Sequence, residues 1–242
     1  MLKSRMQNRK RIYLYIITEF IDDQTLAQWM IDNPKPDFET VRGIVEQIAK
    51  GLRAFHRLEM LHQDLRPAII MIDATGSVKI IDFGSTKVAG ISEIATPIEQ
   101  SNLQGTAQYT APEYLLEEGG TSRPDIFSLG VITYQMLTGK LPYGAEVAKT
   151  KTKATQKKLQ YISVLDDERE IPAWVDDTIK KSVHPDPYKR YETLSGFLYE
   201  LRHPSKEFLN KTRAPLLDRD LVNFWKAISL LLAAVIIALL AK

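Results

Sequence analysis

Apolar positions recur with a helical period in several long segments of this chain. The longest pattern covers residues 37–60, where apolar side chains follow one another at three- and four-residue steps: Val41, Ile44, Val45, Ile48, Leu52 and Phe55. This period predicts an amphipathic helix. Asp37, which comes just after Pro34 and Pro36, is a plausible N-cap for it. A shorter helix is expected over residues 25–31.

Other segments fit extended structure or loops. Ile69–Ile72 and Val78–Ile81 flank the turn-forming run Asp73–Gly76, so the pattern predicts a β-hairpin. Arg11–Phe20 is rich in β-branched and aromatic residues and is expected to be a strand. Residues 85–110 are polar and irregular, which is typical of a surface loop.

The second half of the chain is expected to be helical. Asp125–Leu137 is largely apolar and is soon followed by Gly139, a residue type that commonly ends helices. Further helices are expected near residues 145–160, 173–183 and 191–202. Residues 203–223 have the composition of an extended linker.

The most hydrophobic segment lies at the C-terminus. Ala227–Ala241 contains no charged residue, glycine or proline, and as a helix it would be about 22 Å long. A membrane crossing needs roughly 20 residues, which Phe224 and Trp225 would help to supply at the interface. The alternative is a buried core helix, but such a helix is rarely apolar on every face at a chain end. We therefore expect a transmembrane anchor over residues 224–242.

Basic residues precede this segment: Arg202, Lys206, Lys211, Arg213, Arg219 and Lys226. Positive charge usually stays on the cytoplasmic side of a membrane. The sequence therefore predicts a single-pass protein of the inner (cytoplasmic) membrane, with its main part facing the cytoplasm.

Composition narrows the functional classes. The chain has 242 residues, of which 44% are hydrophobic, enough for a substantial core. A net charge of +2 gives no global case for binding nucleic acid, so no such partner is expected. The absence of cysteine excludes disulfides and thiolate metal sites. Five lysines in residues 149–158 are most simply the solvated face of a helix, and a specific anionic partner is the alternative.

An ordered set of short motifs points to a chemistry. In chain order they are His62-Gln63-Asp64, Asp82-Phe83-Gly84, Gly105-Thr106, Ala111-Pro112-Glu113, Asp125 and Arg190. Each motif alone is weak, but their order and spacing make the set specific. Over roughly residues 12–202 the chain resembles the large lobe of a eukaryotic-like serine/threonine protein kinase. The sequence of residues 62–67 and 105–113, together with the apolar tail, is more narrowly similar to the kinase half of bacterial bifunctional kinase/phosphatase proteins.

The resemblance implies catalytic roles for three charged residues. Asp64 would accept the proton of the attacking hydroxyl group, and Arg66 would supply a cation near the γ-phosphate of ATP. Asp82 would hold Mg²⁺, which neutralises the charge that develops during transfer. ATP and Mg²⁺ are the implied cofactors, and a serine or threonine of another protein is the implied substrate.

Other roles carried over by resemblance concern positioning. Thr106 would contact the Asp64–Arg66 loop, Glu113 and Arg190 would form a buried ion pair, and Asp125 would hold the backbone of the catalytic loop. In the hinge between lobes, backbone groups of Glu19 to Ile21 would meet the adenine, with Thr18 at the gate of its pocket.

Groups that such a kinase also needs are missing from the sequence. A kinase small lobe supplies a Gly-rich loop, a strand lysine and a helix glutamate, but the first glycine here is Gly43 and only Lys3 and Lys10 precede the hinge. Ile69 stands where an asparagine should bind metal. We expect a kinase by family, truncated and weak or inactive alone. The alternatives are a pseudokinase-type binding module, or half of a split kinase whose small lobe or phosphatase domain is a separate partner.

The expected fold class is mainly α with short β-hairpins: a protein-kinase-like large lobe followed by a C-terminal transmembrane helix. The expected domains are a remnant strand and hinge over residues 1–24, the large lobe over 25–203, a juxtamembrane linker over 204–223, and the membrane anchor over 224–242.

Overall fold

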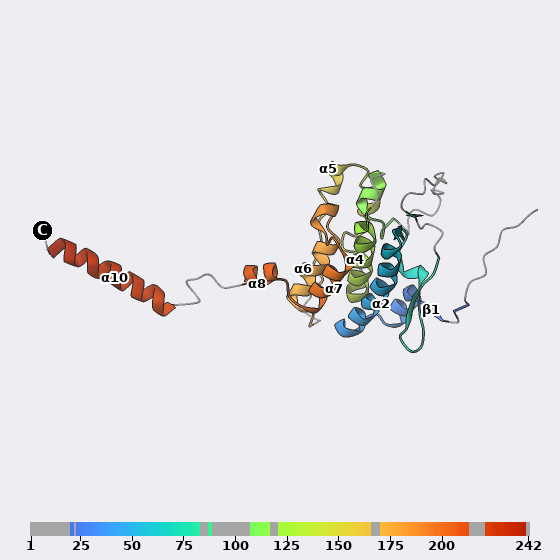
Figure 1. Ribbon diagram of the computed structural model, residues 1–242, viewed down its shortest axis with the longest axis horizontal. Helices are drawn as coiled ribbons and strands as arrows, with labels where there is room; N and C mark the ends of the chain where they lie inside the picture. The colour runs from blue at the N-terminus through green and yellow to red at the C-terminus, as the bar shows by residue number, and fades with distance from the viewer. Residues whose placement is uncertain are drawn as a thin grey trace, which may run out of the picture.

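Two long helices, α2 (Phe38–Arg57) and α4 (Arg123–Thr138), pack against each other at the centre of the lobe. The computed structural model describes residues 20–21, 23–82, 87–88, 107–116, 121–165, 170–212 and 221–240. These residues are mainly helical with a small antiparallel sheet (Figure 1), as the sequence predicted. The remaining helices are α1 (Leu26–Asp32), α5 (Lys153–Gln156), α6 (Ala173–Ser182), α7 (Leu194–Arg202), α8 (Lys206–Thr212) and α10 (Leu221–Leu240). Short 3₁₀ helices are η1 (Pro67–Ile69), η3 (Pro112–Leu116), η4 (Val147–Lys149) and η5 (Pro187–Lys189).

Helix α2 begins where its capping residue predicts. The Asp37 side chain accepts a hydrogen bond from the backbone N–H of Thr40 at 2.8 Å, which satisfies one of the donors exposed at a helix start. The apolar face is buried. The helix ends at Arg57, earlier than residue 60, because Glu59 has a left-handed φ of 56° that no α-helix continues through.

Helix α4 is buried on almost every side, which explains its nearly continuous apolar sequence. It ends at Gly139, whose φ of 70° fits the left-handed conformation that glycine adopts at helix ends. Gly130 lies at the contact with α6: a Cβ there would be 2.2 Å from Ser182 Oγ. The missing side chain therefore allows the two helices to approach closely.

The predicted hairpin is confirmed. Strands β3 (Ile70–Ile72) and β4 (Val78–Ile80) pair antiparallel, with Ile70 opposite Ile80. Strand β1 (Gln24–Thr25) pairs with β3 on its other side. Helix α2 holds the turn, because the Gln47 side chain donates to the carbonyl of Gly76 and accepts from the N–H of Val78. A separate two-stranded sheet joins β2 (Met60–Leu61) to β5 (Lys87–Val88).

Two predictions need correction, one of a helix and one of a linker. The single helix expected near residues 145–160 is only η4 and the one-turn α5, since Val147 and Gln156 are drawn into the interior and the chain bends between them. Residues 203–223 are not wholly an extended linker. They contain α8, which lies near α6 through a 3.5 Å contact between Lys211 Nζ and Asp177 Oδ1, and the first turn of α10.

Helix α10 covers most of the apolar C-terminal segment, as expected. Across the described ranges, however, no helix combines the length and sustained hydropathy that a membrane crossing needs, so the predicted transmembrane helix is not confirmed. The strand predicted at residues 11–20 lies outside the described residues, apart from Phe20.

Candidate functional site

The buried carboxylate of Asp125 holds the backbone of the loop that carries Asp64. Asp125, which is 1% exposed in the first turn of α4, accepts hydrogen bonds from the backbone N–H groups of His62 at 3.1 Å and Gln63 at 3.0 Å. The ring Nε2 of His56 lies 2.8 Å from the same carboxylate. Because Asp125 lies on α4, the loop is fixed to the buried central helix of the lobe.

Unusual backbone conformations gather around this loop. Among the described non-glycine residues, a positive φ occurs at Glu59 (56°), Gln63 (69°) and Asp82 (63°). Gln63 directly precedes Asp64, and Asp82 is the residue expected to bind metal. Such conformations cost free energy and persist only where surrounding contacts enforce them, as the Asp125 bonds to this loop do.

Asp64 has a cationic neighbour. Arg66 Nε donates to Asp64 Oδ2 at 3.2 Å, and both side chains are partly exposed. An open ion pair of this kind leaves both groups accessible to a ligand. The structure thus brings together the two residues to which the sequence assigned catalysis.

His62 lies in the interior, with 0% of its surface exposed. Burial lowers the pKa of its imidazole below the ordinary value, and the charges of Asp125, Asp64 and Asp82 only partly oppose this effect. The ring therefore lies within electrostatic range of the catalytic-loop and metal-loop carboxylates. At neutral pH the ring is therefore neutral.

The donor set suits one Mg²⁺ ion rather than two. Asp82 is exposed just after β4, where its carboxylate can reach a ligand. Ile69 is 4% exposed and apolar, so it cannot coordinate a second ion. Within the described part of the chain, no group of three or more histidine or acidic side chains is arranged to hold a metal. A single Mg²⁺ bound by one carboxylate together with phosphate oxygens and water fits this arrangement.

Arg190 and Glu113 form a buried ion pair. Arg190 donates to Glu113 Oε1 at 2.6 Å and Oε2 at 2.7 Å, and neither side chain is appreciably exposed. The same guanidinium donates to the carbonyls of His184, Pro185 and Arg123. The pair therefore joins η3 to the segments around α4 and η5.

Several predicted site residues lie outside the described residues: Thr18, Glu19 and Thr106, together with Phe83 and Gly84 of the metal-loop motif. Ile21 is described and half-buried. The expectations for the hinge and for Thr106 therefore stay predictions.

Sequence reasoning missed three side chains that position the site. His56 contacts Asp125 across 69 residues, and no local pattern links the two. Ser128 Oγ donates to the carbonyl of Tyr109 at 2.8 Å, and Gln156 Nε2 donates to the carbonyl of Pro112 at 2.7 Å. Only Gln156 could have been suspected from sequence, because it is a polar residue at a position of a short amphipathic turn that faces the interior.

Comparison with known proteins identifies the family. A model described as the protein kinase domain matches residues 2–199, and the chain belongs to this family. It is 30% identical over 198 residues to a probable serine/threonine-protein kinase of Clostridium acetobutylicum, covering 81% of this chain and 29% of that protein. It is 29% identical to the serine/threonine-protein kinase PrkC of Bacillus subtilis, covering 74% and 27%, and 29% identical to the serine/threonine-protein kinase PknB of Mycobacterium leprae, covering 77% and 29%.

The chain thus spans less than a third of the length of these relatives. All three are described as kinases, and no phosphatase fusion is shown. The family implies ATP, Mg²⁺ and protein substrates in general. The narrower resemblance to bifunctional kinase/phosphatase proteins stays a prediction.

Proposed function

We propose that this lobe takes part in transfer of the γ-phosphate of ATP to serine or threonine of a protein. The observation that supports this most directly is the Asp125 carboxylate, which fixes the backbone of His62 and Gln63 and so presents Asp64 at the surface. A proton acceptor must be held in place to act on a substrate hydroxyl.

Each charged group then has a distinct part. Asp64 accepts the hydroxyl proton, and Arg66 leaves its pairing with Asp64 to meet the phosphate. Asp82 would hold a Mg²⁺ ion, which would neutralise phosphate charge. Glu113, Arg190 and Asp125 position these groups. Thr106 would favour hydroxyl substrates. Backbone groups of Glu19 to Ile21 would meet the adenine, with Thr18 at the gate of its pocket.

We further propose that these 242 residues alone have weak or no kinase activity. Their sequence contains no Gly-rich loop and no lysine in an apolar strand before the hinge, and Ile69 removes a metal ligand. Losing such groups costs several kcal/mol of transition-state stabilisation, and each tenfold in rate corresponds to about 1.4 kcal/mol. A separate polypeptide that supplies a small lobe, or a phosphatase domain, would be a functional partner.

A second candidate function is a binding module that retains the substrate surface without catalysis. The buried Ile69 favours it, because an aliphatic side chain in place of a metal ligand is compatible with binding but not with two-metal chemistry. Thermal stability of the purified chain with ATP, measured with and without Mg²⁺, separates the two: a nucleotide-competent lobe is stabilised by an amount that grows with the logarithm of ATP concentration above Kd.

Activity is tested with the same preparation. We expect little phosphate incorporation into a general protein substrate, and any that occurs should disappear in Asp64→Ala. Strong incorporation that depends on Asp64 would refute the proposed weakness. Incorporation that persists in Asp64→Ala, with a contaminating kinase excluded by mass spectrometry, would refute the role of Asp64.

We also propose that α10 attaches the lobe to lipid at the cytoplasmic face of the inner membrane. Large apolar side chains on this helix are exposed, among them Leu230 (73%), Leu231 (68%) and Leu239 (69%). Co-flotation of the full chain with vesicles should be lost in Leu230→Asp/Leu231→Asp/Leu239→Asp and kept in Leu209→Asp, which changes an exposed leucine of α8. Flotation unaffected by the triple change would reject the proposal.

A further inference from the structure

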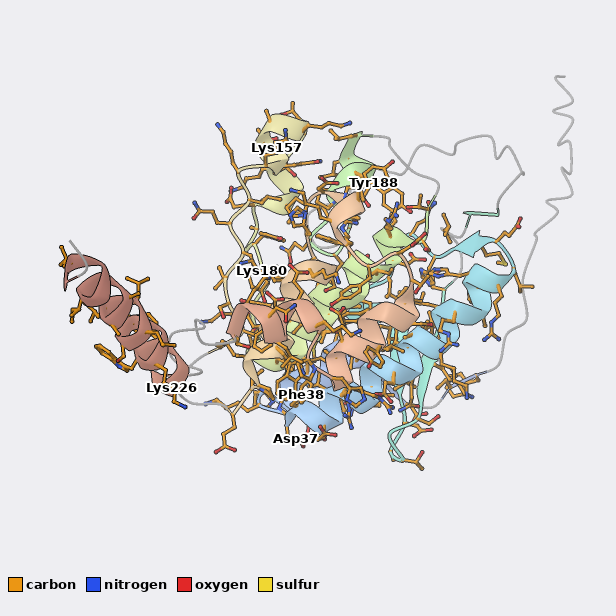
Figure 2. All side chains as sticks on the ribbon, turned by 60° about the vertical axis from the view of Figure 1, so that its left-hand side comes forward. Asp37, Phe38, Lys157, Lys180, Tyr188 and Lys226 are labelled. Carbon is orange, nitrogen blue, oxygen red and sulfur yellow. The ribbon has the colours of Figure 1, made fainter. Side chains whose placement is uncertain are left out.

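A strongly basic surface projects from one end of the lobe. It consists of the lysines of η4, α5 and the adjoining residues, here called the α5 surface: Lys149, Lys151, Lys153, Lys157 and Lys158. All five are exposed. Lys157 and Asp37 lie at opposite ends of the lobe (Figure 2).

Positive charge is concentrated in the sequence of this surface. Residues 145–162 contain five lysines and one acidic residue, Glu146, whereas the whole chain has a net charge of only +2. The Glu146 carboxylate is 2.7 Å from Lys149 Nζ, so it neutralises one end of the surface. Such a local excess attracts an anionic partner and raises its rate of association.

The α5 surface is fixed to the segment that carries Glu113. Gln156 is buried at 7% exposure, and its Nε2 donates to the carbonyl of Pro112 at 2.7 Å. Val147, also buried, packs in one cluster with Ala111 and Phe127. The lysines are therefore displayed on a short turn that is anchored to η3 by Gln156 and Val147.

An exposed aromatic lies at the same end of the lobe. Tyr188 of η5 is 80% exposed, and the guanidinium of Arg123 lies 5.0 Å from its ring centre. Figure 2 shows Tyr188 and Lys157 toward this end. Tyrosine and arginine are enriched at protein–protein interfaces, so the chemistry favours a protein partner over a bare anion.

We propose that the α5 surface binds an acidic segment of a protein substrate and so directs that substrate toward Asp64. The proposal rests on the function proposed above, since it takes Asp64 as the group that acts on the serine or threonine of the protein substrate. A protein segment is favoured over a membrane, because the exposed Tyr188, with Arg123 against its ring, lies at the same end of the lobe, and both residue types are enriched at protein–protein interfaces.

The expected contribution of the α5 surface to the affinity for an acidic segment is moderate. A single exposed ion pair contributes little, but several acting together on one ligand should change affinity about tenfold. Screening by salt should reduce this contribution, because all the lysines involved are exposed.

The test measures the affinity of labelled peptides for the full chain in detergent. Fluorescence anisotropy of the peptide reports binding at low and at high salt. One labelled peptide has a serine followed by a run of glutamates, and the other has glutamines in their place. Three charge reversals remove the surface: Lys151→Glu, Lys157→Glu and Lys158→Glu. A matched control with the same change in net charge is Lys50→Glu, Arg53→Glu and Lys206→Glu. Two of its positions line the open groove of about 520 Å³ between α2 and α7.

We expect the glutamate peptide to bind about tenfold more tightly than the glutamine peptide at low salt. The α5-surface variant should lose this preference, and the control variant should keep it. Equal binding of the two peptides would overturn the proposal. So would equal losses in the two variants, which would show an effect of net charge alone.

A lipid partner is tested in parallel with phosphatidylcholine vesicles, with and without phosphatidylserine. Dependence of vesicle binding on the α5 lysines, with no peptide preference, would replace the proposal with a lipid surface. The assay needs no ATP. A preserved peptide preference together with absent nucleotide binding would therefore refute only the catalytic function, while the α5 surface would stand as a docking site.

Discussion

Arg190 and Glu113, 77 residues apart in sequence, form a bidentate ion pair inside the lobe, with N–O distances of 2.6 and 2.7 Å. The planar guanidinium matches the carboxylate, and its other donors reach three backbone carbonyls. A buried charge is tolerated only when it is satisfied in this way.

The first prediction concerns the removal of one partner of this pair. Arg190→Met leaves the Glu113 carboxylate buried without a counter-charge and should lower the free energy of unfolding by about 3–5 kcal/mol. The matched control is Arg202→Met, which breaks the exposed pair with Glu46 and should cost less than about 1 kcal/mol. Urea unfolding of both variants measures the difference, and equal losses would contradict the assignment of Arg190 as the structural member.

Two glycines in helices should respond in opposite directions to alanine. At Gly130 an added Cβ would meet Ser182 Oγ at 2.2 Å and Val183 Cγ1 at 2.9 Å, so Gly130→Ala should destabilise by about 1–3 kcal/mol. At Gly43 no atom lies within 4 Å, so Gly43→Ala should stabilise by about 0.5–1 kcal/mol through helix propensity. Thermal unfolding tests both. A stable Gly130→Ala protein would show that α4 and α6 are not packed this closely.

Stability should fall as the solution becomes mildly acidic. Burial lowers the pKa of His62, and it also lowers the pKa of His184. As the pH falls below the ordinary histidine value of about 6.5, the unfolded chain takes up these protons before the folded one does. The free energy of unfolding therefore falls with decreasing pH until the lowered pKa values are passed, and it is fully retained above that window.

The matching experiment follows unfolding in urea between neutral pH and the acidic end of the window. His62→Gln should flatten the dependence, and His62→Gln/His184→Gln should flatten it further. Hydrogen bonds lower the pKa values of Asp37 and Asp73 below 3.8, so their contribution is lost only at lower pH and does not mimic this one. An unchanged slope in the double variant would disprove the role of the histidines.

The last prediction concerns the metal ligand. Ile69→Asn places an amide oxygen where a second ion could bind, so it should increase the Mg²⁺-dependent part of stabilisation by ATP. It should also lower the melting temperature without ligand, because a polar group becomes buried. Ile69→Val, which reduces volume without adding oxygen, is the control. A gain in Mg²⁺ dependence in both variants would show that the amide is not responsible.

Local sequence patterns predicted much of the fold. The period of α2, its N-cap Asp37, the hairpin around Gly76 and the end of α4 at Gly139 all depend on residues a few positions apart. Such interactions can be read from sequence because neighbours in the chain are neighbours in space. The same reasoning gave a helix that was too long near residues 145–160, where burial of Val147 and Gln156 outweighs helical propensity.

For the candidate site, the ordered motifs identified Asp64, Asp82 and Asp125 by type, but not how they are held. The contact of His56 with Asp125, and of Gln156 with the carbonyl of Pro112, could not be anticipated, because each joins segments that are far apart in sequence. Thr18, Glu19 and Thr106 lie outside the described residues and stay predictions.

The sequence by itself determined the kinase family and most helix boundaries, because both are encoded in residue types at short or fixed spacings. Only the tertiary structure decided which polar groups meet in the interior. A buried carboxylate such as Asp125 must find its hydrogen-bond partners wherever the fold brings them. Those partners follow from the packing of α2 against α4, which no single segment specifies.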